Sequence, residues 1–202
     1  SPIRELFTAS NQNTADLSIM VEEVVKAASA MAEEKTGALI IFERETNLSE
    51  VIRTGTIVDS NVSAQLLRLL FVKNTPLHDG AVIIRGNKIY AAACYLPLSN
   101  NLHLNKDLGT RHRAGIGISE STDCISVIVS EETGYISMAR GGVLTRNITP
   151  DILRKLLREG LAPQDKGKKA GSKVAGLFRL ADRVSKKRKD KKKRDGDGNG
   201  KA

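Results

Sequence analysis

Gly37-Ala38-Leu39-Ile40-Ile41-Phe42-Glu43 contains five consecutive apolar residues, from Ala38 to Phe42, without a polar interruption. A run of this length is typical of a central strand that is buried on both faces. Residues 124–129 form a second strongly apolar run, in which Ser126 is the one polar residue. Such strands need helices above and below their sheet. The pattern therefore predicts an α/β (α+β-like) fold, a single globular domain with a mixed twisted β-sheet surrounded by helices.

Helical periodicity appears on both sides of these runs. Apolar residues recur at helical spacing over residues 17–35, which predicts a helix. Over residues 62–71 they nearly surround a second predicted helix, which should therefore be well buried. A third helix is expected over residues 151–159. Residues that are typical of helix ends flank each of these segments. The first helix is expected to begin at Asp16 or Ser18 and to end at Gly37. Asp59 or Ser60 should cap the second helix, and the third should begin after Pro150 and end at Gly160.

Strands and turns fill most of the remaining sequence. Residues 81–85 and 88–94 predict a β-hairpin across Gly86-Asn87, because these two residues readily adopt the positive φ of a tight turn. Residues 109–117 are expected to be irregular. Shorter strands are expected over residues 48–52, 56–58, 135–139 and 143–148.

The positive charge of the chain is concentrated near its end. The formal net charge is +9, but residues 164–202 hold 15 Lys and Arg against 5 Asp and Glu. The rest is close to neutral, with 17 against 18, which argues against a general nucleic-acid surface there. We expect a loose lead-in over residues 1–16, a globular domain over 17–163 and a basic, largely disordered tail over 164–202.

Within the tail, residues 174–184 form an amphipathic pattern. On a helix, one face would carry Val174, Leu177, Phe178, Ala181 and Val184. Such a segment, followed by a run of Lys and Arg, suits contact with a membrane surface. A partner-docking segment or a solvated tail explains the same pattern, so the sequence leaves these alternatives open.

Cysteine content and hydropathy bound the cellular setting. Cys94 and Cys124 both lie in apolar runs, which predicts buried thiols in a reducing compartment and not a zinc site. The sequence contains no stretch of 18 apolar residues and no signal peptide, so no transmembrane helix is expected. Because the chain begins at Ser1 without a methionine, we expect a trimmed or processed product.

Three polar strings interrupt the apolar sequence: His78-Asp79-Gly80, Thr110-Arg111-His112-Arg113 and Ser130-Glu131-Glu132-Thr133. Guanidinium groups match phosphate oxygens, and a carboxylate with an imidazole can hold a cation or accept a proton. These residue types predict a metal–polyphosphate site. A turn aspartate, a solvated basic loop and an acidic hairpin turn are the simpler explanations. No Walker loop or Rossmann glycine fingerprint accompanies the strings, so a nucleotide site would be of another kind.

Five strings, taken in order, carry a more specific pattern. They are Gly37-Ala38-Leu39-Ile40-Ile41-Phe42-Glu43, Asn74-Thr75-Pro76-Leu77-His78-Asp79-Gly80-Ala81, Cys94-Tyr95-Leu96-Pro97-Leu98, Leu108-Gly109-Thr110-Arg111-His112-Arg113-Ala114 and Val129-Ser130-Glu131-Glu132-Thr133-Gly134. Together they resemble the bacterial diadenylate cyclase domain, and within it the membrane-anchored CdaA class. The resemblance extends over residues 17–160.

The resemblance implies an enzyme that joins two ATP molecules into cyclic di-AMP and releases two pyrophosphates. Each subunit would hold one ATP, so catalysis would need a face-to-face homodimer. The implied catalytic residues are Asp79, Arg111, His112 and Arg113. The implied ATP-binding residues are Gly80, Ala81, Tyr95, Leu96, Thr110, Arg111, Ser130, Glu131 and Glu132. The implied metal ligands are His78 and Asp79, for Mn²⁺, Mg²⁺ or Co²⁺.

Members of the CdaA class carry N-terminal transmembrane helices, which this sequence lacks. The resemblance thus implies a soluble catalytic fragment of an enzyme at the cytoplasmic face of the bacterial plasma membrane, with no specific nucleic-acid partner. Two other functions compete: a nucleotide-binding regulatory module without catalysis, and nucleic-acid binding through the basic tail. Asp79 favours the enzyme over the module, because a pure sensor needs no carboxylate that activates a hydroxyl.

Overall fold

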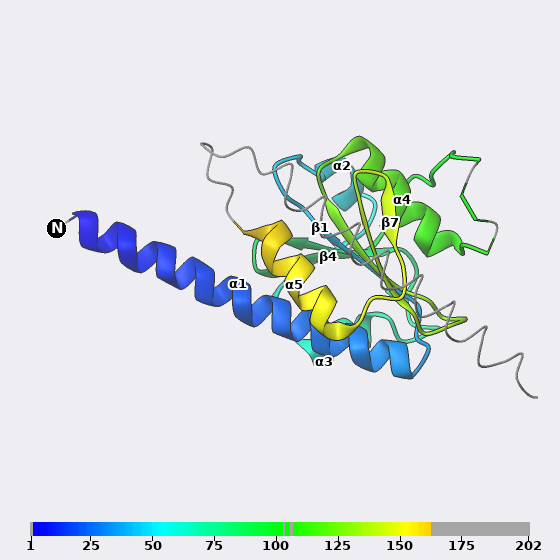
Figure 1. Ribbon diagram of the computed structural model, residues 1–202, viewed down its shortest axis with the longest axis horizontal. Coiled ribbons are helices and arrows are strands. Elements are labelled where there is room, and N and C mark those ends of the chain that lie inside the picture. Colours follow the sequence, from blue (N-terminus) through cyan, green and yellow to red (C-terminus); the bar gives the residue numbers. More distant parts are fainter. Residues whose placement is uncertain (1, 103, 106, 163–202) are drawn as a thin grey trace, which may run out of the picture.

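A seven-stranded mixed β-sheet forms the centre of the computed structural model, which describes residues 2–162 except 103 and 106 (Figure 1). The strand order is β2-β4-β3-β1-β5-β6-β7, and β1 and β3 are the parallel pair. The strands are β1 (Ala38–Phe42), β2 (Thr56–Asn61), β3 (Ala81–Arg85), β4 (Lys88–Cys94), β5 (Ile125–Val129), β6 (Ile136–Arg140) and β7 (Val143–Thr145). The helices are α1 (Pro2–Glu33), α2 (Ser49–Ile52), α3 (Ala64–Leu70), α4 (Thr110–Ser121) and α5 (Pro150–Leu161).

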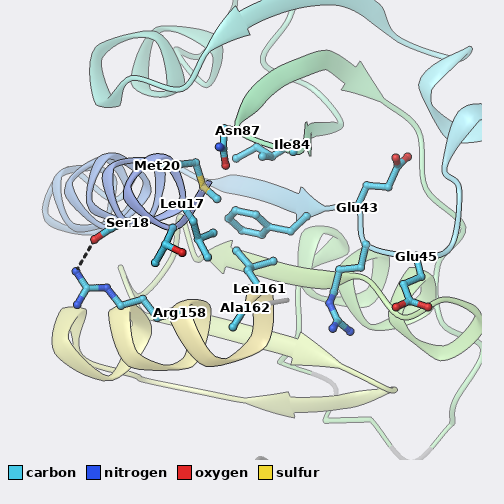
Figure 2. A pocket seen from close by; sticks show the side chains of 14 residues that line it. Leu17, Ser18, Met20, Glu43, Glu45, Ile84, Asn87, Arg158, Leu161 and Ala162 are labelled. Carbon is cyan, nitrogen blue, oxygen red and sulfur yellow. Dashed lines mark hydrogen bonds between the residues drawn. The ribbon is translucent and has the colours of Figure 1, made fainter. Parts of the chain in front are cut away.

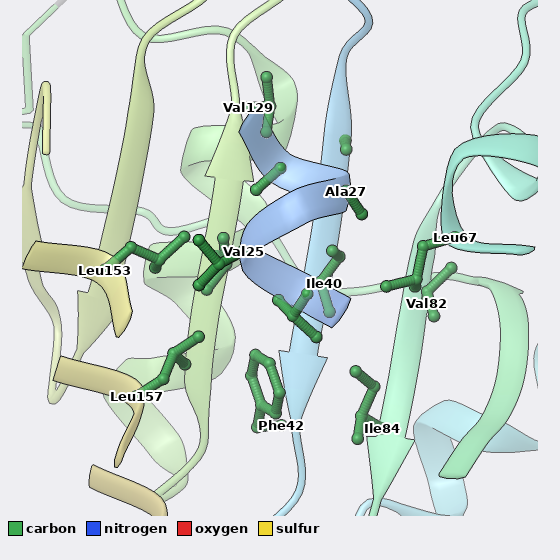
Figure 3. Packing of buried hydrophobic residues seen from close by; sticks show 14 of the residues in the cluster. Val25, Ala27, Ile40, Phe42, Leu67, Val82, Ile84, Val129, Leu153 and Leu157 are labelled. Carbon is green, nitrogen blue, oxygen red and sulfur yellow. The ribbon is translucent and has the colours of Figure 1, made fainter. Parts of the chain in front are cut away.

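The central strand β1 is buried on both faces, as its sequence predicts. Ala38, Ile40 and Phe42 contribute to the core beneath α1, α3 and α5 (Figure 3). Leu39 and Ile41 point the other way, into the core that includes buried residues of α2 and α4. Helices therefore cover both faces of the mixed sheet, and the predicted fold class is confirmed.

Helix α1 begins at Pro2, so the loose lead-in expected over residues 1–16 is wrong. No glycine or proline interrupts residues 3–33, and the helix continues through the predicted caps. Its ribbon projects well beyond the sheet in Figure 1. At the other end, Lys35 takes the left-handed conformation (φ 51°), and the Thr36 N–H donates to Met31 O at 2.8 Å. Gly37 is therefore not the cap that the sequence predicted.

The other predicted helices are confirmed with shifted ends. Ser63 caps α3 by accepting the Leu66 N–H, because Asp59 and Ser60 belong to β2. Thr149 caps α5 in the same way, and the helix continues past the predicted stop at Gly160. Leu69 is 62% exposed, so α3 is less buried than expected.

The largest correction concerns residues 109–117, which were expected to be irregular. Residues 110–121 form α4 instead. Its glycines lower helix propensity, but they allow close packing. A Cβ on Gly117 would lie 2.5 Å from Pro97 O, so the helix approaches the preceding loop more closely than any larger residue would permit. Residues 48–52, expected as a strand, contain the short helix α2.

Several local predictions are confirmed. The β3–β4 hairpin pairs Arg85 with Lys88, and Gly86 has φ 59°. Both cysteines are buried and free. The strands expected over 56–58, 135–139 and 143–148 are present as β2, β6 and β7, with ends shifted by one to three residues. The tail over 164–202, with its amphipathic segment, lies outside the described residues.

Candidate active site

One edge of the sheet gathers most of the predicted site residues. Because β1 is parallel to β3 and antiparallel to β5, the beginnings of β1 and β3 lie beside the end of β5. Cys94 pairs with Ala81, so β4 ends at the same edge. The predicted site residues that flank these strand ends, at 78–80, 95–96 and 130–132, therefore lie along one side of the molecule.

The first turn of α4 supplies groups that suit an anion. Gly109 is the N-cap and makes no side-chain capping bond, and the turn contains no acidic residue. The N–H groups at a helix N-terminus lack intrahelical partners and carry partial positive charge. Together with the hydroxyl of Thr110 and the guanidinium of Arg111, they form a site of the kind that binds phosphate.

A cavity of about 190 Å³ lies between this turn and the β5–β6 turn. Its lining includes six of the predicted catalytic and ATP-binding residues and five others. The predicted ones are Thr110, Arg111, His112, Ser130, Glu131 and Glu132. The others are Asp107, Gly109, Val129, Thr133 and Arg146. Arg113 does not line this cavity, and neither do the predicted residues of the β3 and β4 ends.

Arg146 is the most informative residue that the sequence analysis missed. It directly follows β7, and Thr145 of that strand pairs with Met138 of β6. The end of β7 consequently reaches the same edge as the end of β5. From the sequence, Arg146 lies inside the strand expected over residues 143–148, and its use as a signal required knowledge of where that strand ends and of its direction in the sheet.

Arg111 occupies a space that Gly37 leaves open. A Cβ on Gly37 would lie only 2.6 Å from Arg111 Nη1. The same nitrogen is 3.5 Å from Glu131 Oε2, which is also 3.5 Å from Lys73 Nζ. Arg111 Nε is buried and has no hydrogen-bond partner. A buried polar atom without a partner is uncommon and calls for an explanation, such as a ligand that binds there.

His112 is almost fully buried, with 5% of its surface exposed. Burial, and to a smaller extent the positive charge of the nearby Arg146, lowers the pKa of its imidazole to about 4. The ring is therefore uncharged at neutral pH. It can donate or accept a hydrogen bond in the cavity, but it adds no positive charge for a phosphate.

The β5–β6 turn is held rigid by Ser130. Its Oγ accepts the N–H groups of Glu132 at 3.3 Å and Thr133 at 3.2 Å, and its carbonyl accepts that of Gly134 at 2.9 Å. This arrangement is a serine turn of the common local type. It positions Glu131 and Glu132 at the cavity and leaves the hydroxyl proton of Ser130 free to donate.

The β3 side of the edge presents His78 and Asp79. His78 Nδ1 is 2.7 Å from the Thr75 carbonyl oxygen, so Nδ1 carries the proton and Nε2 is left as an acceptor or metal ligand. Asp79 is exposed, and its Oδ1 accepts the Gly80 N–H at 3.0 Å. Within the described residues, no group of three or more His, Cys, Asp or Glu could hold a metal ion.

Gly80 is required by the fold itself. It has φ 95°, and a Cβ there would lie 2.7 Å from Cys94 O. The backbone at Gly80 therefore packs directly against β4. Ala81 is fully buried in the core, so only its backbone can reach a ligand.

Tyr95 and Leu96 follow β4 at this edge. Tyr95 is 67% exposed, and its N–H donates to Thr54 Oγ1 at 2.8 Å. The hydroxyl of Thr54 thus fixes the backbone while the aromatic ring remains available. A role for these two residues in adenine binding stays a prediction.

A model of the family described as "DisA bacterial checkpoint controller nucleotide-binding" (DAC) matches residues 25–144. The chain belongs to the DAC family. The matched range includes every predicted site residue, whereas Arg146 lies just beyond it.

Relatives of this DAC domain include named cyclases. The cyclic di-AMP synthase CdaA of Bacillus subtilis is 50% identical over 137 residues, 68% of this chain and 50% of the relative. A diadenylate cyclase of Listeria monocytogenes is 50% identical over 142 residues, 70% of this chain and 52% of the relative. The chain therefore spans about half the length of the curated relatives that it matches.

Solved structures show the same DAC fold. The crystal structure of DacA from Staphylococcus aureus, a double mutant, has a TM-score of 0.70 and 52% sequence identity. The alignment covers 71% of this chain and 96% of that one. A hypothetical membrane spanning protein from Bacillus cereus has a TM-score of 0.61 and 41% identity, with 63% of each chain covered. In the part of this chain that the structure describes, no helix is long and apolar enough to cross a membrane.

Proposed function

We propose that this chain is the catalytic domain of a diadenylate cyclase, which condenses two ATP molecules into cyclic di-AMP and two pyrophosphates. The observation that carries the proposal is the position of Arg111, with a buried unpaired Nε, beside the uncapped N-terminus of α4. Identity of 50% to proteins named cyclic di-AMP synthase and diadenylate cyclase supports it.

The cavity beside α4 is the proposed phosphate site. The N–H groups of the first helical turn and the Thr110 hydroxyl would bind phosphate oxygens. Arg111 would exchange its 3.5 Å contact with Glu131 for a phosphate. Arg146 would add positive charge, and the uncharged His112 would contribute a hydrogen bond. Such fixed donors stabilise the charge that develops as pyrophosphate departs.

Asp79 is the proposed proton acceptor. In each condensation, the 3′-oxygen of one ATP bonds to the α-phosphorus of the other, and the bond from that phosphorus to pyrophosphate breaks. The 3′ proton passes to Asp79, and pyrophosphate leaves with the electron pair. Two such steps close the cyclic dinucleotide.

The spacing of these groups supports a homodimer as the active form. Asp79 precedes β3, Ser130 follows β5, and β1 lies between these two strands. The strand ends that carry Asp79 and Ser130 are therefore two strand spacings apart, about 10 Å. One bound ATP would extend along the edge, and its ribose would need the α-phosphate of an ATP on a second subunit. We propose that two copies meet through this edge, with each supplying its own nucleotide. Arg113 does not line the cavity, so it would act where the two copies meet or hold the region around α4 in place.

The donor set at His78 and Asp79 fits a divalent metal ion. Nε2 of His78 is oriented by the bond from Nδ1 to Thr75, a common arrangement for metal-binding histidines. With Asp79, it provides two ligands of the types that Mn²⁺, Mg²⁺ and Co²⁺ accept, and phosphate oxygens and water would complete the set. A bound ion would neutralise phosphate charge and favour loss of the 3′ proton.

The location of the complete protein is also part of the proposal. The CdaA relative and the membrane spanning protein from Bacillus cereus suggest a membrane-anchored enzyme whose catalytic domain lies on the cytoplasmic side. The proposal includes no specific nucleic-acid partner, because residues 1–163 are close to neutral.

Incubation of the full chain with ATP and Mn²⁺, followed by mass spectrometry, tests the activity. Cyclic di-AMP should appear, and specific activity should rise with protein concentration, because two copies must meet. Asp79→Asn should abolish the product while ATP binding persists. Asp151→Asn is the matched control, because that carboxylate is 92% exposed at the start of α5. ATP binding by calorimetry without turnover under any divalent ion would reject the cyclase and favour a regulatory module.

A further inference from the structure

A second cavity, of about 820 Å³, lies at the opposite edge of the sheet from the candidate active site. Its floor is formed by Phe42 and Ile84, near the ends of β1 and β3. Leu17 and Met20 of α1 form one wall, and the end of α5 forms another (Figure 2). The proposed cyclase mechanism uses none of these residues.

The two helical walls of this cavity are tied together. Arg154 Nε and Arg158 Nη2 each donate to Glu22 Oε1 at 2.8 Å, and Arg158 Nη2 also donates to Ser18 Oγ at 3.2 Å. The bond between Arg158 and Ser18 is visible at the rim in Figure 2. The cavity is thus held open by fixed contacts between α1 and α5, and its volume falls in the range of ligand-binding pockets.

The chain itself leaves from the wall of this cavity. Leu161 and Ala162 line the cavity and are the last residues that the structure describes. Residues 163–173 follow, eleven positions that are mostly polar, and then comes the amphipathic pattern of residues 174–184. A linker of eleven residues has a root-mean-square span of roughly 20 Å, enough to turn back onto the cavity from which it starts.

We propose that the cavity is the docking site for residues 174–184 of the same chain. The apolar face of this segment would enter the cavity and contact Leu17, Leu161 and Ala162, the apolar lining residues that are not fully buried. The apolar residues of the segment are Val174, Leu177, Phe178, Ala181 and Val184. Attachment through a short linker gives the segment a millimolar local concentration at the cavity, so modest apolar contact is sufficient for docking.

The charges at the rim agree with this occupant. Glu43 is paired with Arg85, Arg44 with Asp123 and Arg158 with Glu22. Among the charged lining residues that the structure describes, Glu45 is the carboxylate for which no ion pair is found. Residues 174–184 carry Arg179 and Arg183 against one acid, Asp182, so docking would bring a net positive charge to the rim that holds this carboxylate.

A photo-crosslinking experiment on the full chain tests the proposal. Phe178 is replaced by the photoreactive residue benzoylphenylalanine, and Gly176, on the opposite side of the helical pattern, is replaced in a matched control. Irradiation at position 178 should give crosslinks within one chain. Peptide mass spectrometry should locate them on peptides that contain Leu17, Met20 or Leu161. The yield at 178 should exceed that at 176 at least fivefold.

A second variant connects the crosslink to the cavity. Leu17→Glu places a charge on the half-exposed wall and should reduce the crosslink yield at 178 to that of the 176 control, with the melting temperature measured in parallel. Three results would overturn the proposal. They are crosslinks between two chains, equal yields at the two positions, and crosslinks at 178 that persist unchanged in Leu17→Glu. Binding of residues 174–184 to anionic lipid vesicles without any crosslink to the cavity would also reject it.

Discussion

Replacement of Gly37 by alanine would move the Arg111 guanidinium without changing its charge. The new Cβ would lie 2.6 Å from Arg111 Nη1, 3.1 Å from Cζ and 3.2 Å from the Cβ of Glu131. Carbon and nitrogen atoms in contact normally stay about 3.5 Å apart. The guanidinium must therefore retreat by roughly 1 Å, and its 3.5 Å contact with Glu131 must change.

The expected loss is large for activity and small for stability. A displacement of about 1 Å in a positioning group can reduce the rate about 100-fold, which corresponds to about 2.7 kcal/mol. The atoms that must move are mainly the far end of a flexible side chain. Alanine also restricts the unfolded chain, which contributes about 0.4–1 kcal/mol in favour of folding. We therefore expect a change of less than about 1 kcal/mol in the free energy of unfolding.

Steady-state synthesis of cyclic di-AMP from ATP and Mn²⁺ measures kcat/KM, and urea denaturation measures stability. Gly109→Ala is the matched control, because no atom lies within 4 Å of a Cβ at that position although it lines the same cavity. Gly37→Ala should lose roughly 10- to 100-fold in kcat/KM, far more than Gly109→Ala. A folded Gly37→Ala protein with unaltered kcat/KM and ATP affinity would refute the proposed role of the guanidinium position.

Three further predictions concern stability. Gly80→Ala should lower the free energy of unfolding by about 2 kcal/mol or more, because φ is 95° and Cys94 O lies 2.7 Å from the new Cβ; an unchanged urea midpoint would contradict this. His112 has a folded pKa of about 4 against 6.5, so only the unfolded chain gains its proton as pH falls from about 6.5 to 5. The urea midpoint should therefore fall over this window, and more steeply than in His112→Gln; parallel curves would exclude His112 as the cause. Asp123→Ala should cost about 1 kcal/mol, because Oδ2 accepts the Glu45 N–H at 3.1 Å, and thermal melting would detect it.

The local sequence determined the centre of the fold. The run from Ala38 to Phe42 places alternate side chains in two different cores, which is possible only for a strand with helices on both faces. The Gly86-Asn87 turn likewise determined the β3–β4 hairpin. Burial periodicity and turn geometry are properties of a few neighbouring residues, so they are visible without tertiary structure.

Helix ends and the region around α4 were harder to predict. The glycines at 115 and 117 argue for an irregular segment by propensity, yet both lie inside α4 because close packing overrides their entropic cost. Ser63, rather than Asp59 or Ser60, caps α3 because β2 extends to Asn61. Whether a residue joins a strand or caps a helix depends on the neighbouring strand that it can pair with, and that strand lies far away in the sequence.

The residue types of the candidate site, including Asp79, Arg111 and Ser130, can be read from the sequence alone. Their arrangement in space depends on how distant segments pack. Strand order inserts β1 between the Asp79 and Ser130 sides, and it carries Arg146 to the cavity from the end of β7. The absence of a side chain at Gly37, just before β1, makes room for Arg111 of α4, and these two residues lie far apart in the sequence. The physical reason is that sheet register and packing distances are set by contacts between distant segments, whereas sequence patterns report only the burial and turns of neighbouring residues.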